Sequence, residues 1–329
     1  MKTNKISIAI IAIITFFVTS CTVDVPVKPS SNGKTCEIVV VSSQKVLTSS
    51  IYDSIKAYFM RQNPYLPQAE PLFTVVPLTQ MQFNSNEMFR HLRNLIIINI
   101  GSFSDKKEFM IYKDNWATNQ MIFEFNLTNT SQFQSVFGDK KELIEKAFLN
   151  GERERMKRVF KSVENTDISD LLIKHFDFKM TFPEGFRVLA KNDSIIALSK
   201  DTKDYTQTIL LYTYRYEKQS FKQENILKHR NFLGKTHIQS GIDSAYMGTE
   251  MRVPVASDTI NFCGKFAVRT QGLWRFYGDF LGGPFQNYVF LDEKTNKIVM
   301  IDSFLYAPQK DKRDLLMQLE GIVYSMTSI

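Results

Sequence analysis

An apolar run at residues 95–100 sets the tightest limit on how this chain can fold. It reads Leu-Ile-Ile-Ile-Asn-Ile, so a strand here would present apolar side chains on both of its faces. Such a strand needs cover on both sides, which is typical of the centre of a parallel sheet with helices on each face. The run therefore predicts a layered arrangement of helices and strands around it.

The rest of the first half fits this prediction, because strand and helix patterns alternate. Strands are expected at residues 37–42, 73–77 and 121–127, and helices at 50–60, 86–92 and 140–161. After residue 165 the pattern changes to short strands separated by turn residues, as at Pro183-Glu184-Gly185 and Asn192-Asp193. Helices are expected there at 167–176, 223–233 and 310–326, and one long strand is expected at 259–270. The prediction is an α+β protein with an α/β-like domain at 36–165, followed at 166–329 by a mainly antiparallel sheet with flanking helices.

The N-terminus has the pattern of an export signal. Lys2 and Lys5 precede a thirteen-residue apolar run at 6–18, which is too short to span a bilayer. The following Val18-Thr19-Ser20-Cys21 resembles the lipobox of bacterial lipoproteins, in which the cysteine is acylated after cleavage. The expectation is a signal peptide at 1–20, a lipidated Cys21 and a flexible tether at 21–35 that is rich in Pro, Ser, Asn and Gly. The alternative is an uncleaved anchor with an incidental cysteine.

Charge and cysteine content limit the partners and the redox chemistry. Removal of the leader leaves 39 basic and 34 acidic residues, a mild net charge of +5 with the two signs interspersed. A nucleic-acid-binding protein would need a clustered basic face, so no nucleic-acid partner is expected. Cys36 and Cys263 then remain, and either a disulfide or two separate buried thiols would suit them.

Several stretches resemble an uncharacterised family of Bacteroidota lipoproteins. They lie at residues 66–73, 89–100, 114–117, 152–155, 182–185, 272–285 and 306–314. The resemblance covers nearly all of the mature chain, from about residue 33 to the end, and it implies an envelope lipoprotein without an assigned activity. Cys36 and Cys263 lie outside these stretches. In the second half, two short strands after a Phe-Pro-x-Gly turn and a closing helix are similar to the Mog1/PsbP-type fold.

The stretch 272–285 is the main candidate for ligand binding. Its candidate contact residues are Trp274, Arg275, Tyr277, Asp279, Gly282 and Gly283. Aromatic rings beside an Arg and an Asp suit stacking on a sugar or a peptide, and paired glycines allow close backbone approach. The alternative is a strand, a Gly-Gly-Pro turn and a second strand, with the aromatic side chains in the core.

Charged residues offer two further candidates. Arg90 and Arg93 flank the start of the apolar run, where they would contact a ligand or form surface ion pairs. The sequence Glu152-Arg153-Glu154-Arg155 predicts a solvated helix face with an ion pair from Glu154 to Arg158, and an anion-binding cluster is the alternative.

Four sites resemble the Asp-Ser/Thr-apolar acceptor of Bacteroidota O-glycosylation. They are Ser54, Ser194, Ser244 and Thr259. Ser244 is the best placed of the four, since Ser54 falls on an expected helix and Thr259 on an expected strand.

Signatures of known chemistry are missing from the sequence. It has no P-loop, no Gly-x-Ser-x-Gly elbow and no His-Glu-x-x-His motif, and its four histidines lack metal-ligand spacing. No metal, no cofactor and no identified catalytic residue is therefore expected. The first hypothesis is a non-catalytic binding or assembly factor for a peptide, a glycan or an envelope protein. The alternatives are a hydrolase acting on an envelope polymer through dispersed residues, and a structural subunit.

The anchor also predicts a location. Acyl chains on Cys21 would attach the protein to a membrane, and only Asp24 follows the cysteine closely. Because an acidic export tract is lacking, we expect the periplasmic side of the outer membrane, with surface exposure as the alternative.

Overall fold

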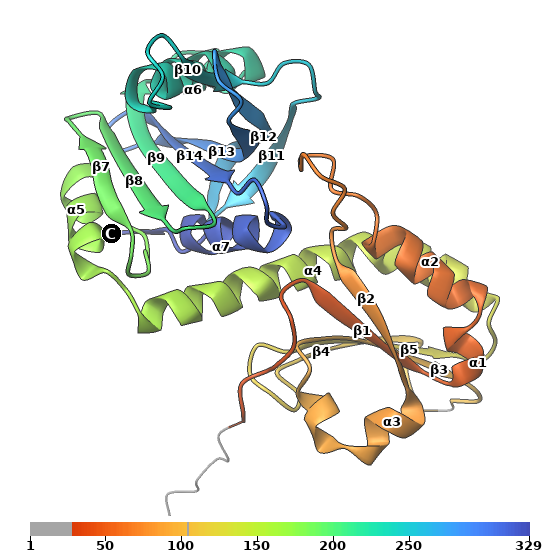
Figure 1. The fold of residues 1–329 in the computed structure, drawn as a ribbon. Coiled ribbons are helices and arrows are strands. Elements are labelled where there is room, and N and C mark those ends of the chain that lie inside the picture. Colours follow the sequence, from red (N-terminus) through yellow and green to blue (C-terminus); the bar gives the residue numbers. More distant parts are fainter. Residues whose placement is uncertain (1–27, 104) are drawn as a thin grey trace, which may run out of the picture.

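The computed structural model describes residues 28–103 and 105–329, so the expected signal peptide and Cys21 lie outside the described residues. Two sheets with their own helices lie on either side of the long helix α4 (Gln132–Ser162) (Figure 1). We refer to the half with the smaller sheet as the N-terminal domain and to the other as the C-terminal domain. The expected α+β class is confirmed. Within the described residues, no helix is long and apolar enough to cross a membrane.

The N-terminal domain is built on a five-stranded sheet with the order β2-β1-β3-β5-β4. Its strands are β1 (Glu37–Ser42), β2 (Thr74–Thr79), β3 (Asn94–Ile100), β4 (Phe109–Lys113) and β5 (Met121–Leu127). The apolar run forms β3, which pairs in parallel with β1 and β5 and is buried over its first five residues. The predicted central strand is thus confirmed. The sequence patterns missed β4, a half-buried antiparallel edge strand.

Helices cover both faces of this sheet. On one face lie α1 (Gln44–Leu47), α2 (Ser50–Phe59) and α4. On the other face lie α3 (Gln80–Ser85) and the 3-10 helix η1 (Glu87–His91), packed through Phe83 and Phe89. The apolar side chains of β3 alternate between these two cores, which explains the unbroken run.

The C-terminal domain contains an eight-stranded antiparallel sheet with the order β10-β12-β13-β14-β9-β8-β7, in which β11 also pairs with β12. Its strands are β7 (Arg187–Lys191), β8 (Ile195–Asp201), β9 (Thr206–Arg215), β10 (Tyr246–Thr249), β11 (Ala256–Phe262), β12 (Lys265–Tyr277), β13 (Gly282–Asp292) and β14 (Lys297–Tyr306). The single strand expected at 259–270 is wrong, because the chain reverses between β11 and β12. Cys263 and Gly264 make that turn with φ values of 50° and 85°.

Helices also cover both faces of the larger sheet. α5 (Thr166–Phe176) and α7 (Arg313–Val323) pack on one face, and α6 (Gln223–His237) packs on the other. A short pair, β6 (Phe178–Lys179) and β15 (Thr327–Ser328), joins the ends of this domain. The helix expected to end at residue 233 continues through Gly234. A Cβ at Gly234 would lie 3.1 Å from the Met247 carbonyl oxygen, so the glycine allows α6 to approach β10 closely.

The two domains meet along α4 and α7. Gly321 of α7 lies so close to α4 that a Cβ there would overlap the Cβ of Met156. Met317 of α7 packs into the core of the N-terminal domain. The Glu70 carboxylate of the N-terminal domain accepts hydrogen bonds from the backbone N–H groups of Lys312 and Arg313 at the start of α7. The junction is therefore packed and hydrogen-bonded.

The chain enters the N-terminal domain beside η1. Asn32 N donates to His91 O at 2.9 Å, and Thr118 N donates to Pro29 O at 2.8 Å. The later part of the expected tether is thus held on the domain by backbone hydrogen bonds.

Candidate functional site

The aromatic segment 272–285 forms the end of β12, a turn and the start of β13. Trp274 is 3% exposed, and its indole Nε1 donates to Leu305 O at 3.2 Å. Phe276 is also buried and packs edge-on against Trp274, with ring centroids 5.9 Å apart. A Cβ at Gly283 would overlap the Leu305 carbonyl oxygen, so this glycine permits strand packing. The structure places these aromatic side chains in the core, as in the alternative interpretation of the segment. The expected Gly-Gly-Pro turn is wrong, because the chain turns at residues 278–281 and Gly282 already begins β13.

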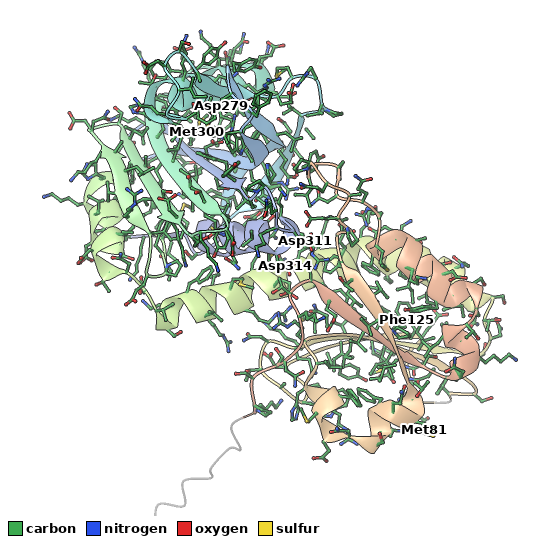
Figure 2. All side chains as sticks on the ribbon, viewed as in Figure 1. Met81, Phe125, Asp279, Met300, Asp311 and Asp314 are labelled. Carbon is green, nitrogen blue, oxygen red and sulfur yellow. The ribbon has the colours of Figure 1, made fainter. Side chains whose placement is uncertain are left out.

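The polar members of the segment bond to residues of the same sheet, chiefly at the end of the neighbouring strand β10. Arg275 Nη1 lies 3.3 Å from the Glu250 carboxylate, and Tyr277 donates to Thr249 O at 2.9 Å. The Asp279 carboxylate accepts from Phe280 N in the turn, far from α4 (Figure 2). Gly282 lies against the carbonyl oxygen of Trp274 on the paired strand. The candidate residues are therefore engaged by their own hairpin and by the neighbouring strands β10 and β14 of the same sheet.

Glu152 and Arg155 belong to a buried network at the start of β3, so the predicted solvated helix face is wrong. Glu152 is fully buried and accepts from Arg93 Nη1 at 3.1 Å and from Asn94 Nδ2 at 2.8 Å. Arg155 lies 2.7 Å from Glu152, and burial lowers the pKa of Arg155 although Glu152 opposes the shift. The Glu154 carboxylate pairs with Lys157 at 2.9 Å rather than with Arg158.

Arg90 and Arg93 are not brought together. Arg93 belongs to the buried network, whereas Arg90 is part-exposed and lies 3.8 Å from the Glu87 carboxylate. The network fits a structural role, because both carboxylate oxygens of Glu152 are already engaged. Oε2 accepts from Arg93 and from Arg155 Nε, and Oε1 accepts from Asn94 Nδ2 and lies 2.7 Å from Arg155 Nη2.

The four acceptor-like sites differ in exposure. Ser194 and Ser244 lie exposed in loops, and Ser244 has a φ of 70°. Thr259 is exposed on β11. Ser54 lies on α2 and donates to Ser50 O at 2.8 Å, so its hydroxyl is engaged by the helix. Ser194, Ser244 and Thr259 are thus exposed, and of these Ser194 and Ser244 lie in loops.

A cavity of about 300 Å³ lies between the domains and is lined by four arginines. They are Arg61, Arg153, Arg269 and Arg313. Each pairs with a carboxylate: Arg61 with Glu145, Arg153 with Glu320, Arg269 with Asp258 and Arg313 with Asp314, at 2.7–3.0 Å. These ion pairs offset the positive charge, and the Arg153–Glu320 pair joins the two domains. The cavity is therefore best described as part of the junction.

The thiols are separate in the structure. Cys36 lines the junction cavity, and burial raises the pKa of its thiol well above the usual value. Cys263 occupies the β11–β12 turn, and both cysteines are free. A protonated, buried Cys36 is a poor nucleophile.

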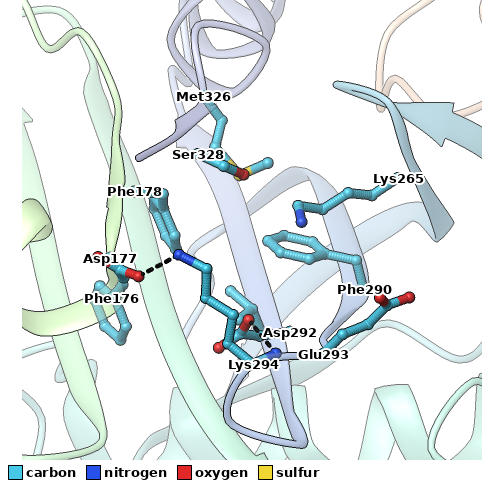
Figure 3. A pocket seen from close by; sticks show the side chains of 11 residues that line it. Phe176, Asp177, Phe178, Lys265, Phe290, Asp292, Glu293, Lys294, Met326 and Ser328 are labelled. Carbon is cyan, nitrogen blue, oxygen red and sulfur yellow. Dashed lines mark hydrogen bonds and ion pairs between the residues drawn. The ribbon is translucent and has the colours of Figure 1, made fainter.

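A smaller cavity of about 240 Å³ lies near the end of the chain (Figure 3). Phe178 and Phe290 form part of its wall, and Lys265 projects toward it. Lys294 crosses its mouth and donates to the Asp177 carboxylate at 2.8 Å and to Ile329 O at 3.1 Å. Lys294, which lines the cavity, is therefore already paired with the protein's own groups.

A larger cavity of about 450 Å³ lies between α6 and β9, and we refer to it as the aromatic pocket. Tyr212 and Tyr214 line it from β9, and His229 and Phe232 line it from α6. Its other lining residues are polar: Arg215, Glu217, Ser220, Asn225 and Lys228. Side chains two residues apart on a strand share a face, as do side chains three apart on a helix, so each element turns two rings toward the pocket.

Three rings of the aromatic pocket, those of Tyr212, Tyr214 and His229, stack on one another. Tyr214 and His229 lie with centroids 3.8 Å apart and planes 20° apart, and Tyr212 follows at 5.4 Å from Tyr214. Phe232 is 56% exposed at the mouth. The Tyr214 hydroxyl oxygen is buried and has no hydrogen-bond partner among the described residues.

Burial also sets the charge of the stack. It raises the pKa of the Tyr214 phenol, and it lowers the pKa of His229 with a smaller contribution from Lys228. Both rings are therefore neutral near pH 7. The sequence patterns did not predict this site, although they contain alternating tyrosines on a strand and the three-residue spacing of His229 and Phe232 on a helix.

Metal binding has no candidate in the described part of the chain. Residues 28–103 and 105–329 contain no group of three or more His, Cys, Asp or Glu side chains placed to hold a metal ion.

Comparison with known proteins divides the chain as the two sheets do. Residues 31–161 match the model of a domain of unknown function, DUF8532, and residues 163–325 match that of another, DUF4837. Two domains of unknown function make up most of the chain. The expected lack of an assigned activity agrees with these matches, although they are to two domain families and not to one family along the chain. No curated protein matches the chain.

Solved structures similar to part of the chain share little sequence with it. The Ran-binding protein Mog1p of Saccharomyces cerevisiae is 12% identical, with a TM-score of 0.30, over 46% of this chain and 89% of its own. A mutant of the protein Mog1 is 11% identical, with a TM-score of 0.30, over 46% and 91%. LpqN, involved in cell envelope biogenesis of Mycobacterium tuberculosis, is 12% identical, with a TM-score of 0.28, over 46% and 82%.

The features described above fall into different parts of these two matches. The aromatic pocket lies wholly within the DUF4837 region, as do residues 272–285. The Glu152 network belongs to the DUF8532 region, and the arginine-lined cavity has walls from both.

Proposed function

We propose that this protein is a lipid-anchored binding protein of the cell envelope that holds a saccharide in the aromatic pocket without catalysing its breakdown. The observation that carries the proposal is the convergence of four rings on one cavity of about 450 Å³ with a polar rim. Pockets that bind small ligands are concave, mostly apolar, and carry a few polar groups that fix orientation.

The chemistry of the rings favours a sugar. Neutral aromatic faces pack well against the apolar C–H faces of a pyranose ring, while amides and charged groups bond its hydroxyls. Phe232 presents an exposed ring at the mouth, and Asn225 and Lys228 lie on the same helix beside it.

The arrangement favours binding over hydrolysis. Glycoside hydrolysis generally needs two carboxyl groups on either side of the scissile bond. Among the described lining residues, Glu217 is the one carboxylate, and His229 packs on Tyr214 without a carboxylate partner. These features support a binding role over the alternative of a hydrolase.

The proposed location rests on the N-terminal sequence. The basic start, the short apolar run and the lipobox-like Val18-Thr19-Ser20-Cys21 support acylation of Cys21. Together with the resemblance to Bacteroidota lipoproteins, they favour an outer-membrane protein that faces the periplasm. Ligands in that place would be envelope glycans or glycan-bearing peptides and proteins.

Calorimetric titration with chitohexaose and cellohexaose tests the proposal. Phe232→Ala removes an exposed ring at a cost of about 1 kcal/mol in binding, which should weaken Kd roughly fivefold. Phe280→Ala is the matched control, because Phe280 is a fully exposed phenylalanine outside the pocket. Equal binding by wild type and a folded Phe232→Ala variant, or no binding of either oligosaccharide, would refute the proposal. Shortened products in a mass spectrum would instead support a hydrolase.

A further inference from the structure

The outer surface of α3 and η1, residues 79–91, differs from the rest of the protein. It lies on the face of the N-terminal sheet opposite α4, and so on the side of the molecule away from the C-terminal domain (Figure 1). Met81 projects outward from this surface (Figure 2). We refer to it as the α3–η1 face.

The α3–η1 face combines exposed apolar side chains with very little charge. Met81 is 79% exposed and Met88 is 64% exposed. In a chain with 23% charged residues, this thirteen-residue segment holds only Glu87 and Arg90, which lie 3.8 Å from each other. Its other exposed side chains are mainly amides and hydroxyls. Contact with a lipid surface would therefore bury methionines and desolvate few charges.

The entry point of the chain lies beside this face. Asn32 N donates to the carbonyl of His91, the last residue of η1, and Arg93 N donates to Asn32 O at 3.0 Å. Cys21 precedes Lys28, the first described residue, by seven positions. Seven extended residues reach at most about 25 Å. An acyl chain on Cys21 would therefore keep the α3–η1 face close to the membrane.

We propose that the α3–η1 face is a membrane-contact surface, which rests on lipid headgroups with Met81 and Met88 inserted. This inference depends on the acylation of Cys21 in the proposed function. Amphipathic segments bind a bilayer interface weakly on their own, and an acyl anchor beside them supplies the second signal. Through the packed α4–α7 junction, the contact would place α6 and the aromatic pocket on the side away from the membrane (Figure 1).

Site-specific fluorescence tests the contact in the full chain, acylated in cells and reconstituted in vesicles of phosphatidylethanolamine and phosphatidylglycerol. Met81→Cys and Met88→Cys, in a Cys36→Ala/Cys263→Ser background, would carry an environment-sensitive label. Phe266→Cys is the control, since Phe266 is 60% exposed on β12 of the other domain. Quenchers attached to lipid should quench the labels at positions 81 and 88 several-fold more than the label at 266.

Two measurements separate the possible failures. Mass spectrometry of the reconstituted protein shows whether Cys21 carries acyl chains. A Cys21 without acyl chains would overturn both the proposed anchor and the proposed membrane contact. Acylated protein whose labels at 81 and 88 remain as water-exposed as the control would overturn the contact alone. Hydrogen exchange on unlabelled protein gives an independent readout: the amides of residues 80–90 should be protected in vesicles relative to detergent, and unchanged exchange would refute the inference.

Discussion

Glu70 offers the sharpest test of how the two domains are held together. Its carboxylate lies in the N-terminal domain and accepts from Lys312 N at 2.8 and 2.9 Å and from Arg313 N at 2.8 Å. Lys312 is the N-cap of α7 but caps it with no side-chain hydrogen bond. Glu70 therefore acts as the N-cap of α7 although it belongs to the other domain. Its negative charge also interacts favourably with the positive end of the helix dipole.

The structure gives a magnitude for the loss of this cap. Glu70 is 7% exposed, so its hydrogen bonds form largely out of water. Glu70→Ala removes two charge-assisted donor contacts, each worth about 1.5–3 kcal/mol. Water that reaches the freed N–H groups replaces part of the lost hydrogen-bond free energy. We therefore expect the free energy of unfolding to fall by about 3 kcal/mol. Glu87→Ala is the control, because that side chain is 87% exposed and its loss should cost less than about 0.5 kcal/mol.

The two tryptophans of the chain allow each domain to be followed separately. Trp116 packs against Phe83 in the N-terminal domain, and Trp274 lies in the core of the C-terminal domain. Urea unfolding of the Trp116→Phe and Trp274→Phe variants, each with and without Glu70→Ala, reports one domain at a time. We expect both transitions to move to lower urea. A shift below about 0.5 kcal/mol in both would refute the capping argument, and a shift confined to the Trp274 signal would refute coupling between the domains.

Two further predictions concern the junction and the pH dependence of stability. Gly321→Ala forces a Cβ into Met156 across α4 and α7, so we expect a loss of about 1–3 kcal/mol in urea unfolding, and an unchanged midpoint would contradict the close approach. Hydrogen bonds from Arg252 lower the pKa of Glu250 to about 2, so the stability that ionised Glu250 contributes is present above about pH 4.5 and is lost as the pH falls toward 2. Wild type should therefore lose more stability than Glu250→Gln between pH 5 and pH 2, and parallel curves would contradict this.

The local sequence pattern was sufficient to predict an element where the burial of its side chains followed from that element's own sequence. The run that forms β3 has apolar side chains on both faces of the strand. Its position in the middle of the sheet could therefore be predicted without knowledge of the neighbouring strands. The start of α4 was harder, because the helix begins at Gln132, eight residues before the expected start. Phe133 and Phe137 pack there against Phe125, a contact between elements that the helix sequence alone does not reveal.

The candidate site shows the same limit. Segment 272–285 has the composition of a binding loop and also that of a buried hairpin, and only the pairing of β12 with β13 and β10 decides between them. The aromatic pocket draws on β9 and α6, which pack against each other on one face of the larger sheet. Each element contributes two rings and neither is unusual alone, so the site emerges only from tertiary packing.

The burial of Glu152, Arg153 and Arg155 has a physical cause that lies outside α4 itself. A helix that is polar on most sides is expected to be exposed to solvent unless it connects two domains. In α4, Glu152 and Arg155 turn toward the start of β3, while Arg153 turns toward Glu320 of α7. Neighbouring residues on a helix point about 100° apart, so opposite charges in sequence can serve two different domains. Residues 152–155 are therefore charged because α4 is buried between the two sheets and bonds to both domains. Removing Glu152 or Glu320 would leave a buried arginine without its carboxylate and would lower the free energy of unfolding by about 3–5 kcal/mol.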